Sequence, residues 1–92
     1  MGTRKSPDKQ DLRNSLSESG DKRLMLHNDD VHTFDYVIDS LIEVCNYTME
    51  QAEQITYIVH YKGECEVKKG DYELLKPFRD GLFGRELKVT IE

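Results

Sequence analysis

The sequence contains no tryptophan, and only two cysteines and two prolines occur among its 92 residues. Cys45 and Cys65 form no CxxC pair, and no histidine has the spacing of a zinc knuckle, which argues against a disulfide scaffold and a structural zinc site. Nowhere do about 18 apolar residues follow one another, and the first residues lack the apolar stretch of a secretion signal. We therefore expect a reduced, cytoplasmic protein without a membrane span.

Positive charge is also scarce, since 13 Lys and Arg residues stand against 18 Asp and Glu residues and leave a net charge of −5. Nucleic acids and anionic membranes are bound through clustered Lys and Arg side chains, so neither is an expected partner. A chain of this length has room for one small domain and not for a large enclosed active site. No nucleophile elbow or Gly-rich phosphate loop is visible, and we do not expect an enzyme.

Residues 1–22 differ in composition from the rest of the chain. Their only large apolar side chains are Met1, Leu12 and Leu16, which cannot bury enough surface to offset the entropy of ordering. We expect a flexible N-terminal arm over these residues and a folded core over 23–92.

A strand and a helix are expected at the start of the core. Residues 23–27 form a short apolar run that is closed by Asn28-Asp29-Asp30, a combination typical of a buried strand that leads into a turn. Thr33 is placed to cap the helix that follows. Apolar residues then recur at the spacing of an amphipathic helix, at Phe34, Val37, Ile38, Leu41, Ile42 and Cys45.

A second helix is marked at both ends. Thr48 and Gln51 match a capping box, in which the threonine hydroxyl accepts from the glutamine backbone amide and the glutamine side chain reaches back. Gly63 supplies a C-terminal stop, which places His60 in the last turn of this helix.

The last third of the chain predicts two strands around a third helix. Apolar and charged residues alternate in a strand that ends at Gly70 and again over 87–91. The apolar residues between them indicate a short helix, with Pro77 in its first turn or at a kink and Gly81 weakening it. The order β-α-α-β-α-β predicts an α+β fold, a compact domain in which a three-stranded antiparallel sheet packs against three helices.

The most unusual polar cluster lies between the first strand and the first helix, over 27–32, with the sequence HNDDVH. Ordinary turn chemistry alone explains an Asn-Asp-Asp sequence. A metal site needs three or four converging ligands, and adjacent residues rarely converge, so we expect no bound metal. His60 could pair with Asp29 or Asp30 in acid–base catalysis, or it could be an ordinary partly buried histidine. These residue types alone leave the choice open.

Four segments of the core together resemble the ClpS family. They are Leu26–Asp30, Phe34–Ile38, Ala52 with Val59–Gly63, and Leu87–Glu92, and the resemblance covers 23–92. An Asn-Asp-Asp turn, a later Val-His-x-x-Gly helix end and a short terminal strand form a specific combination. The resemblance implies a non-enzymatic adaptor of the ClpA/ClpP-type ATP-dependent protease. Such an adaptor binds N-degrons, which are proteins whose first residue is Leu, Phe, Tyr or Trp.

The resemblance also implies site residues. Asn28, Asp30 and His60 match positions that hold the α-amino group of the substrate, with Asp29 beside them. The pocket for the first side chain matches His32, Phe34, Val37, Thr56, Val59 and Leu87. An ammonium group has three N–H donors and needs three acceptors, which an amide oxygen, a carboxylate and a neutral imidazole can provide.

Three of these pocket positions depart from the common pattern of the family. Phe34 stands where Met is usual and should still exclude β-branched first residues, His32 replaces a frequent Thr, and Thr56 replaces a frequent Met. We expect the smaller residue at position 56 to enlarge the cavity and partly compensate for the bulk of Phe34. The order of preference among Leu, Phe, Tyr and Trp stays open.

The partners that the resemblance implies are N-degron substrate proteins and the N-terminal domain of a Clp AAA+ unfoldase. Lys76 lies near a position that contributes to docking in the family, and the N-terminal arm resembles the extension that the unfoldase engages during hand-off. We expect a monomer without cofactor or metal. The alternative is a ClpS-like protein-interaction domain without N-degron recognition, because one fold can serve many functions.

Overall fold

The computed structural model describes residues 22–92, and the arm expected over 1–22 lies outside these residues except for its last position. The elements are β2 (Lys22–His27), α2 (Phe34–Cys45), α3 (Met49–Lys62), β3 (Glu64–Gly70), α4 (Tyr72–Gly84) and β4 (Lys88–Ile91). This order confirms the predicted α+β fold class. Within 22–92, none of the helices has the length and apolar character needed to cross a membrane.

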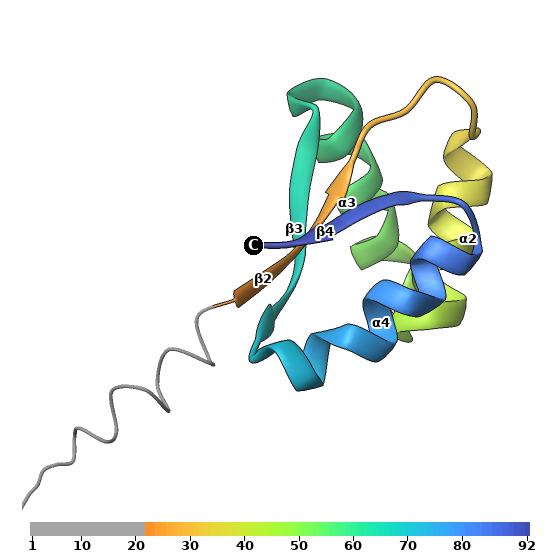
Figure 1. The fold of residues 1–92 in the computed structure, drawn as a ribbon. Helices are drawn as coiled ribbons and strands as arrows, with labels where there is room; N and C mark the ends of the chain where they lie inside the picture. Colours follow the sequence, from red (N-terminus) through yellow and green to blue (C-terminus); the bar gives the residue numbers. More distant parts are fainter. Residues whose placement is uncertain (1–21) are drawn as a thin grey trace, which may run out of the picture.

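The central strand of the antiparallel sheet is β2, because the strand order is β3-β2-β4 (Figure 1). Leu24 pairs with Ile91 and Leu26 pairs with Val89 across β4. On the β3 side the register shifts between Leu24 and Met25, as in a β-bulge. The alternate residues Leu24 and Leu26 are fully buried in the core with the helices, so the helices cover one face of the sheet.

Local sequence signals set the ends of α2 and α3. The Thr33 hydroxyl accepts a hydrogen bond from the Tyr36 backbone N–H at 3.1 Å, which caps α2. Both bonds of the capping box between Thr48 and Gln51 are present at the start of α3. Gly63 ends α3 in the left-handed region at φ 92°, where glycine is favoured. The predicted boundaries of these two helices are confirmed.

The third helix is longer than the sequence predicted. α4 has 13 residues, its N-cap Asp71 accepts from the Leu74 backbone N–H at 2.8 Å, and Pro77 lies inside it rather than in its first turn. Proline there removes one backbone hydrogen bond. Leu75 and Leu82, on either side of Pro77, are fully buried in the core and hold the helix in place. The expectation of a short helix was therefore wrong, because burial outweighs the local cost of proline.

The end of α4 is tied closely to α2. A Cβ added at Gly81 would lie 2.7 Å from Val44 Cγ1, so glycine permits this approach of the two helices. The Tyr36 hydroxyl donates to the Arg85 carbonyl at 2.8 Å, and Arg85 Nε donates to the buried Ser40 Oγ at 2.8 Å. These contacts fix the path by which the chain leaves α4 and enters β4.

Candidate functional site

A pocket of about 300 Å³ opens where the end of β2, the start of α2 and the last turns of α3 meet. Its lining residues are Leu26, His27, Asn28, Asp29, Asp30, His32, Thr33, Phe34, Val37, Thr56, Val59, His60 and Leu87. The structure thus brings together, in one pocket, every residue predicted for the amino group and every residue predicted for the first side chain.

Three side chains of the pocket have unused hydrogen-bonding capacity. Within residues 22–92, the side chains of Asn28, Asp30 and His60 make no hydrogen bond, and all three residues are exposed. The Asn28 backbone N–H donates to the Gly63 carbonyl at 2.9 Å, which ties this turn to the end of α3, the helix that carries His60. An amide, a carboxylate and an imidazole therefore line one pocket with their acceptors free.

Asp29 makes a different use of its carboxylate. Its Oδ1 accepts from the backbone N–H groups of Val31 at 2.8 Å and His32 at 2.9 Å, and His32 Nδ1 lies 3.1 Å from Oδ2. Partial burial opposes ionisation, but the hydrogen bonds from His32 and Val31 outweigh it and lower the pKa of Asp29. The Asp29 carboxylate thus stabilises the turn and fixes the position of His32 at the pocket.

The polar side chains of residues 27–32 do not converge on one common site. Asp29 pairs with His32, whereas His27 Nδ1 lies 3.3 Å from Glu64 Oε1. Among the described residues, no three potential ligand atoms of this segment come together. His60 bonds to neither Asp29 nor any other side chain of 22–92, so no acid–base pair forms with it in this part of the chain.

The apolar part of the pocket is provided by buried residues of α3 and of the chain after α4. Val59 and Leu87 are 5% and 2% exposed, and Thr56 is 3% exposed. The Thr56 hydroxyl donates to the Ala52 carbonyl at 2.7 Å. The side-chain polarity at position 56 is therefore satisfied by the backbone, and an apolar ligand would not leave this hydroxyl unpaired.

Aromatic rings surround His60. Phe34 lies edge-to-face with His60 at 5.1 Å and with Tyr57 at 5.5 Å between ring centroids. Tyr61 lies edge-to-face with His60 at 5.0 Å and stacks on Tyr57 at 6.0 Å. These contacts restrict the orientations of the imidazole ring and place Phe34, which is 37% exposed, at the rim of the pocket.

A profile of the family described as "ATP-dependent Clp protease adaptor protein ClpS" matches residues 18–80. The chain belongs to the ClpS family. The ClpS match includes the Asn28–Asp30 turn and His60, and it ends before Leu87. The structure nevertheless places Leu87 in the same pocket as His60.

Two curated ClpS proteins are similar to part of the chain. The ATP-dependent Clp protease adapter protein ClpS of Nitratidesulfovibrio vulgaris (Miyazaki F) is 47% identical over 47 residues, which cover 49% of this chain and 47% of the relative. The protein of the same name from Cronobacter sakazakii is 37% identical over 54 residues, which cover 59% of this chain and 51% of the relative. The chain thus spans about half the length of the curated relatives it matches.

A solved ClpS structure has the same fold. Agrobacterium tumefaciens ClpS2, solved bound to L-phenylalaninamide, superimposes with a TM-score of 0.70 over 77% of this chain and 93% of its own. The sequence identity is 21%, so this likeness concerns the fold.

Some residues of the site could not be assigned by the resemblance to ClpS. Leu26, His27 and Thr33 line the pocket because the strand end and the helix cap on which they lie face the same opening. Tyr57 and Tyr61 contact Phe34 or His60. The spacing of Tyr57, His60 and Tyr61, three and four residues apart on one helix, was a signal that these rings would meet.

Lys76, expected to contribute to docking, lies on α4 and is not among the pocket residues. Its Nζ donates to Asp80 Oδ2 at 2.9 Å, one helical turn away, and this bond raises the pKa of Lys76. Both side chains are about half exposed, so the pair contributes little to stability and Lys76 can exchange Asp80 for another anion.

Proposed function

We propose that this chain is a non-catalytic adaptor that binds the free α-amino group and the bulky first side chain of proteins beginning with Leu, Phe, Tyr or Trp. It would deliver these N-degron proteins to a Clp-type AAA+ unfoldase. The observation that carries the proposal is the meeting of three free acceptors, on Asn28, Asp30 and His60, in one pocket with apolar walls. Membership of the ClpS family and the binding of L-phenylalaninamide by the neighbour ClpS2 support it.

The polar half of the pocket matches a free amino terminus. An α-amino group has a reference pKa of about 7.7–8.0, so near neutral pH it is largely an ammonium with three N–H donors. The amide oxygen of Asn28, the carboxylate of Asp30 and the imidazole of His60 offer three acceptors, and the carboxylate adds charge-assisted strength. An internal peptide nitrogen has one donor and no charge, and acetylation produces such a nitrogen at the terminus. N-acetylated peptides are therefore excluded.

The apolar half of the pocket matches a bulky first side chain. Burial of a Leu or Phe side chain beside Val37, Val59 and Leu87 contributes about 1.5–3 kcal/mol relative to leaving it in water. That range corresponds to an affinity advantage of roughly tenfold to a hundredfold over a peptide that begins with Ala. Recognition of an N-degron thus needs both halves of the site.

Fluorescence anisotropy with labelled peptides tests the proposal. Peptides that begin with Leu, Phe, Tyr, Trp, Ile or Ala are measured in free and N-acetylated forms. We expect binding of the free bulky peptides at about micromolar Kd, near −8 kcal/mol, and none of their acetylated forms. Equal binding of both forms would favour a ClpS-like interaction domain without N-degron recognition.

Two pocket variants and one control make this test specific. Asp30→Asn and His60→Ala should each weaken binding of a Leu-led peptide by at least about tenfold, since each removes or weakens one acceptor for the ammonium. Asp35→Asn is the matched control, because Asp35 is an exposed carboxylate in the first turn of α2 outside the pocket lining. If Asp35→Asn weakened binding as much as Asp30→Asn, the effect would reflect overall charge instead of a specific acceptor.

Delivery requires contact with the N-terminal domain of the unfoldase, and α4 with the exposed Lys76 is the proposed docking surface. The proposed handle for the unfoldase is the arm of residues 1–22. A Lys76→Glu variant should lose co-precipitation with that domain and keep its peptide affinity. Loss of both activities would show a folding defect, and loss of neither would remove Lys76 from the docking surface.

A further inference from the structure

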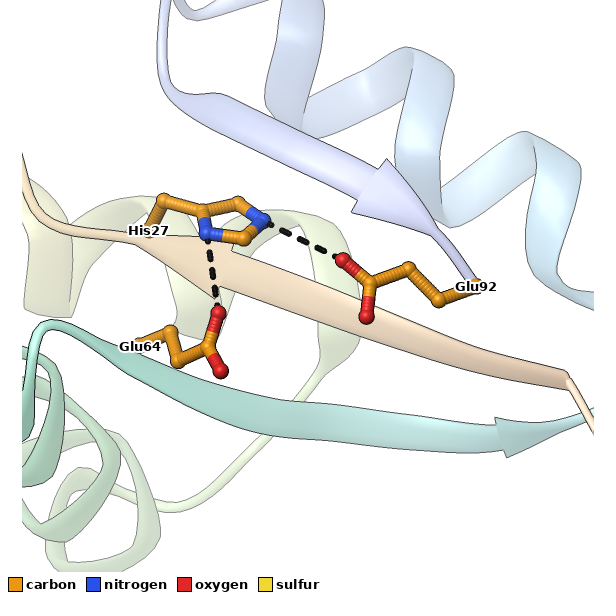
Figure 2. A group of neighbouring side chains, drawn as sticks. All are labelled: His27, Glu64 and Glu92. Carbon is orange, nitrogen blue, oxygen red and sulfur yellow. Dashed lines mark ion pairs between the residues drawn. The ribbon is translucent and has the colours of Figure 1, made fainter.

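A second polar cluster lies on the face of the sheet that points away from the helices, and it joins all three strands (Figure 2). His27 ends the central strand β2, Glu64 lies opposite it on β3, and Glu92 follows β4. His27 Nδ1 lies 3.3 Å from Glu64 Oε1, and His27 Nε2 lies 3.9 Å from Glu92 Oε2. One potential ligand atom from each residue lies within 4.8 Å of the other two.

The polar contacts around His27 lack one proton. Three contacts form a chain: Glu64 to His27 Nδ1 at 3.3 Å, His27 Nε2 to Thr90 Oγ1 at 2.7 Å, and Thr90 Oγ1 to Glu92 Oε2 at 3.0 Å. A neutral imidazole has one N–H and threonine has one O–H, so only two protons are available for the three contacts. One contact would therefore join two acceptors, which is unfavourable unless a proton or a metal cation lies between them.

The Thr90 hydroxyl indicates which contact lacks the proton. If this hydroxyl donates to Glu92, then His27 Nε2 donates to Thr90, and the unprotonated Nδ1 lies 3.3 Å from Glu64 Oε1. An unprotonated imidazole nitrogen and a carboxylate oxygen this close together are a suitable pair of ligands for a divalent cation.

We propose that His27 Nδ1, Glu64 and Glu92 form a binding site for a divalent metal ion of the zinc class. One neutral imidazole and two carboxylates are ligands of the kind that Zn²⁺ accepts, and their two negative charges balance the ion. Metal–ligand bonds of 2.0–2.2 Å at a tetrahedral ion place the ligand atoms roughly 3.4 Å apart, and Nδ1 and Glu64 Oε1 are already at 3.3 Å. Glu92 Oε2 lies 3.9 Å from Nε2, so the exposed side chain of Glu92 has to turn toward the Nδ1 side of the ring to reach the ion, and water completes the site.

The sheet supplies the preorganisation that adjacent loop residues lack. His27 and Glu64 are direct cross-strand partners, so hydrogen bonds of the ladder fix their separation. Two cations of this face compete with a bound ion within 22–92: Arg23, whose Nη2 lies 3.9 Å from Glu92 Oε1 in an exposed pair that is worth little, and the exposed Lys88, which is the partner of His27 on β4. A bound ion would join the three strands and stabilise the folded state, because the unfolded chain holds no such arrangement.

Calorimetric titration of the untagged full chain with ZnCl₂, with MgCl₂ as the hard-cation control, tests the site. We expect saturation at one equivalent of zinc and no comparable binding of magnesium. His27→Gln and Glu64→Gln should each weaken zinc binding by at least tenfold. Glu66→Gln should not, because Glu66 is an exposed carboxylate on the same strand and on the same face as Glu64.

Several outcomes would overturn the proposal. They are the absence of saturable zinc binding, undiminished binding by His27→Gln, and binding that is lost only in His32→Gln or Cys65→Ser. Nitrogen NMR of the His27 ring separates a metal from a proton. If Nδ1 still carries a proton at saturating zinc, the proton fills the contact with Glu64 and the proposed site does not exist. Circular dichroism of each variant verifies that its fold is intact.

Discussion

Replacement of Gly81 by alanine should destabilise the protein, although alanine is the better helix former by about 1 kcal/mol. The new Cβ would lie 2.7 Å from Val44 Cγ1, far inside the optimal carbon–carbon separation of about 3.5–4.0 Å. Val44 is β-branched and lies in the last turn of α2, and a helical valine strongly prefers one χ1 rotamer, so its methyl group cannot easily turn away. Overpacking of this kind costs about 2 kcal/mol, which leaves a net loss of about 1 kcal/mol.

Urea unfolding followed by circular dichroism measures this difference. Gly84→Ala is the matched control, because Gly84 lies on the same helix and an added Cβ would meet nothing within 4 Å. That variant should gain up to about 1 kcal/mol. In a Val44→Ala background the clash disappears, so Gly81→Ala should no longer destabilise. If Gly81→Ala were as stabilising as Gly84→Ala in the unaltered chain, the argument from the close approach of α2 and α4 would be refuted.

Three further predictions concern the pocket, the turn and the thiols. Thr56→Met should fill part of the pocket and weaken binding of a Trp-led peptide about tenfold more than that of a Leu-led peptide in anisotropy titrations, and equal losses would contradict this. The lowered pKa of Asp29 means that its carboxylate stabilises the fold above pH 3.8 and that this contribution disappears as the pH falls through the folded-state pKa. The stability difference between the unaltered chain and Asp29→Asn, from urea unfolding, should therefore shrink between pH 6 and pH 3, and a constant difference would count against it. Burial raises the pKa of the Cys45 thiol to about 11, so iodoacetamide at pH 8 should alkylate Cys65 first and Cys45 only at the rate of unfolding, whereas equal rates would show that Cys45 is accessible.

The parts of the fold that were predictable are those set by local chemistry. Thr33, Thr48 and Gly63 determine where α2 and α3 begin or end, and each acts through residues within four positions. The length of α4 was not predictable in this way, because Pro77 and Gly81 both disfavour a helix locally. α4 nevertheless forms because its apolar side chains are buried against distant elements, and its glycine allows the close approach of Val44. Only the packed structure contains these contacts.

The same distinction applies to the two polar clusters. Most residues of the pocket lie in the turn after β2 or on α2 and α3, and the resemblance of these segments to ClpS, rather than their spacing alone, indicated them. The cluster of His27, Glu64 and Glu92 depends on the register of three strands. A shift of one residue would send Glu64 to the opposite face of the sheet, and no sequence pattern fixed that register in advance.

The turn after β2 has a consequence for how this pocket can change. Surface loops usually accept insertions, because their backbone groups can turn to water. Here the backbone N–H of Asn28 donates a hydrogen bond to the Gly63 carbonyl. The backbone N–H groups of Val31 and His32 donate to Asp29 Oδ1. An inserted residue would break these bonds together and separate the turn from the end of α3. New ligand preferences in this scaffold would therefore have to come from exchange of side chains on a backbone of constant length, and not from longer or shorter loops.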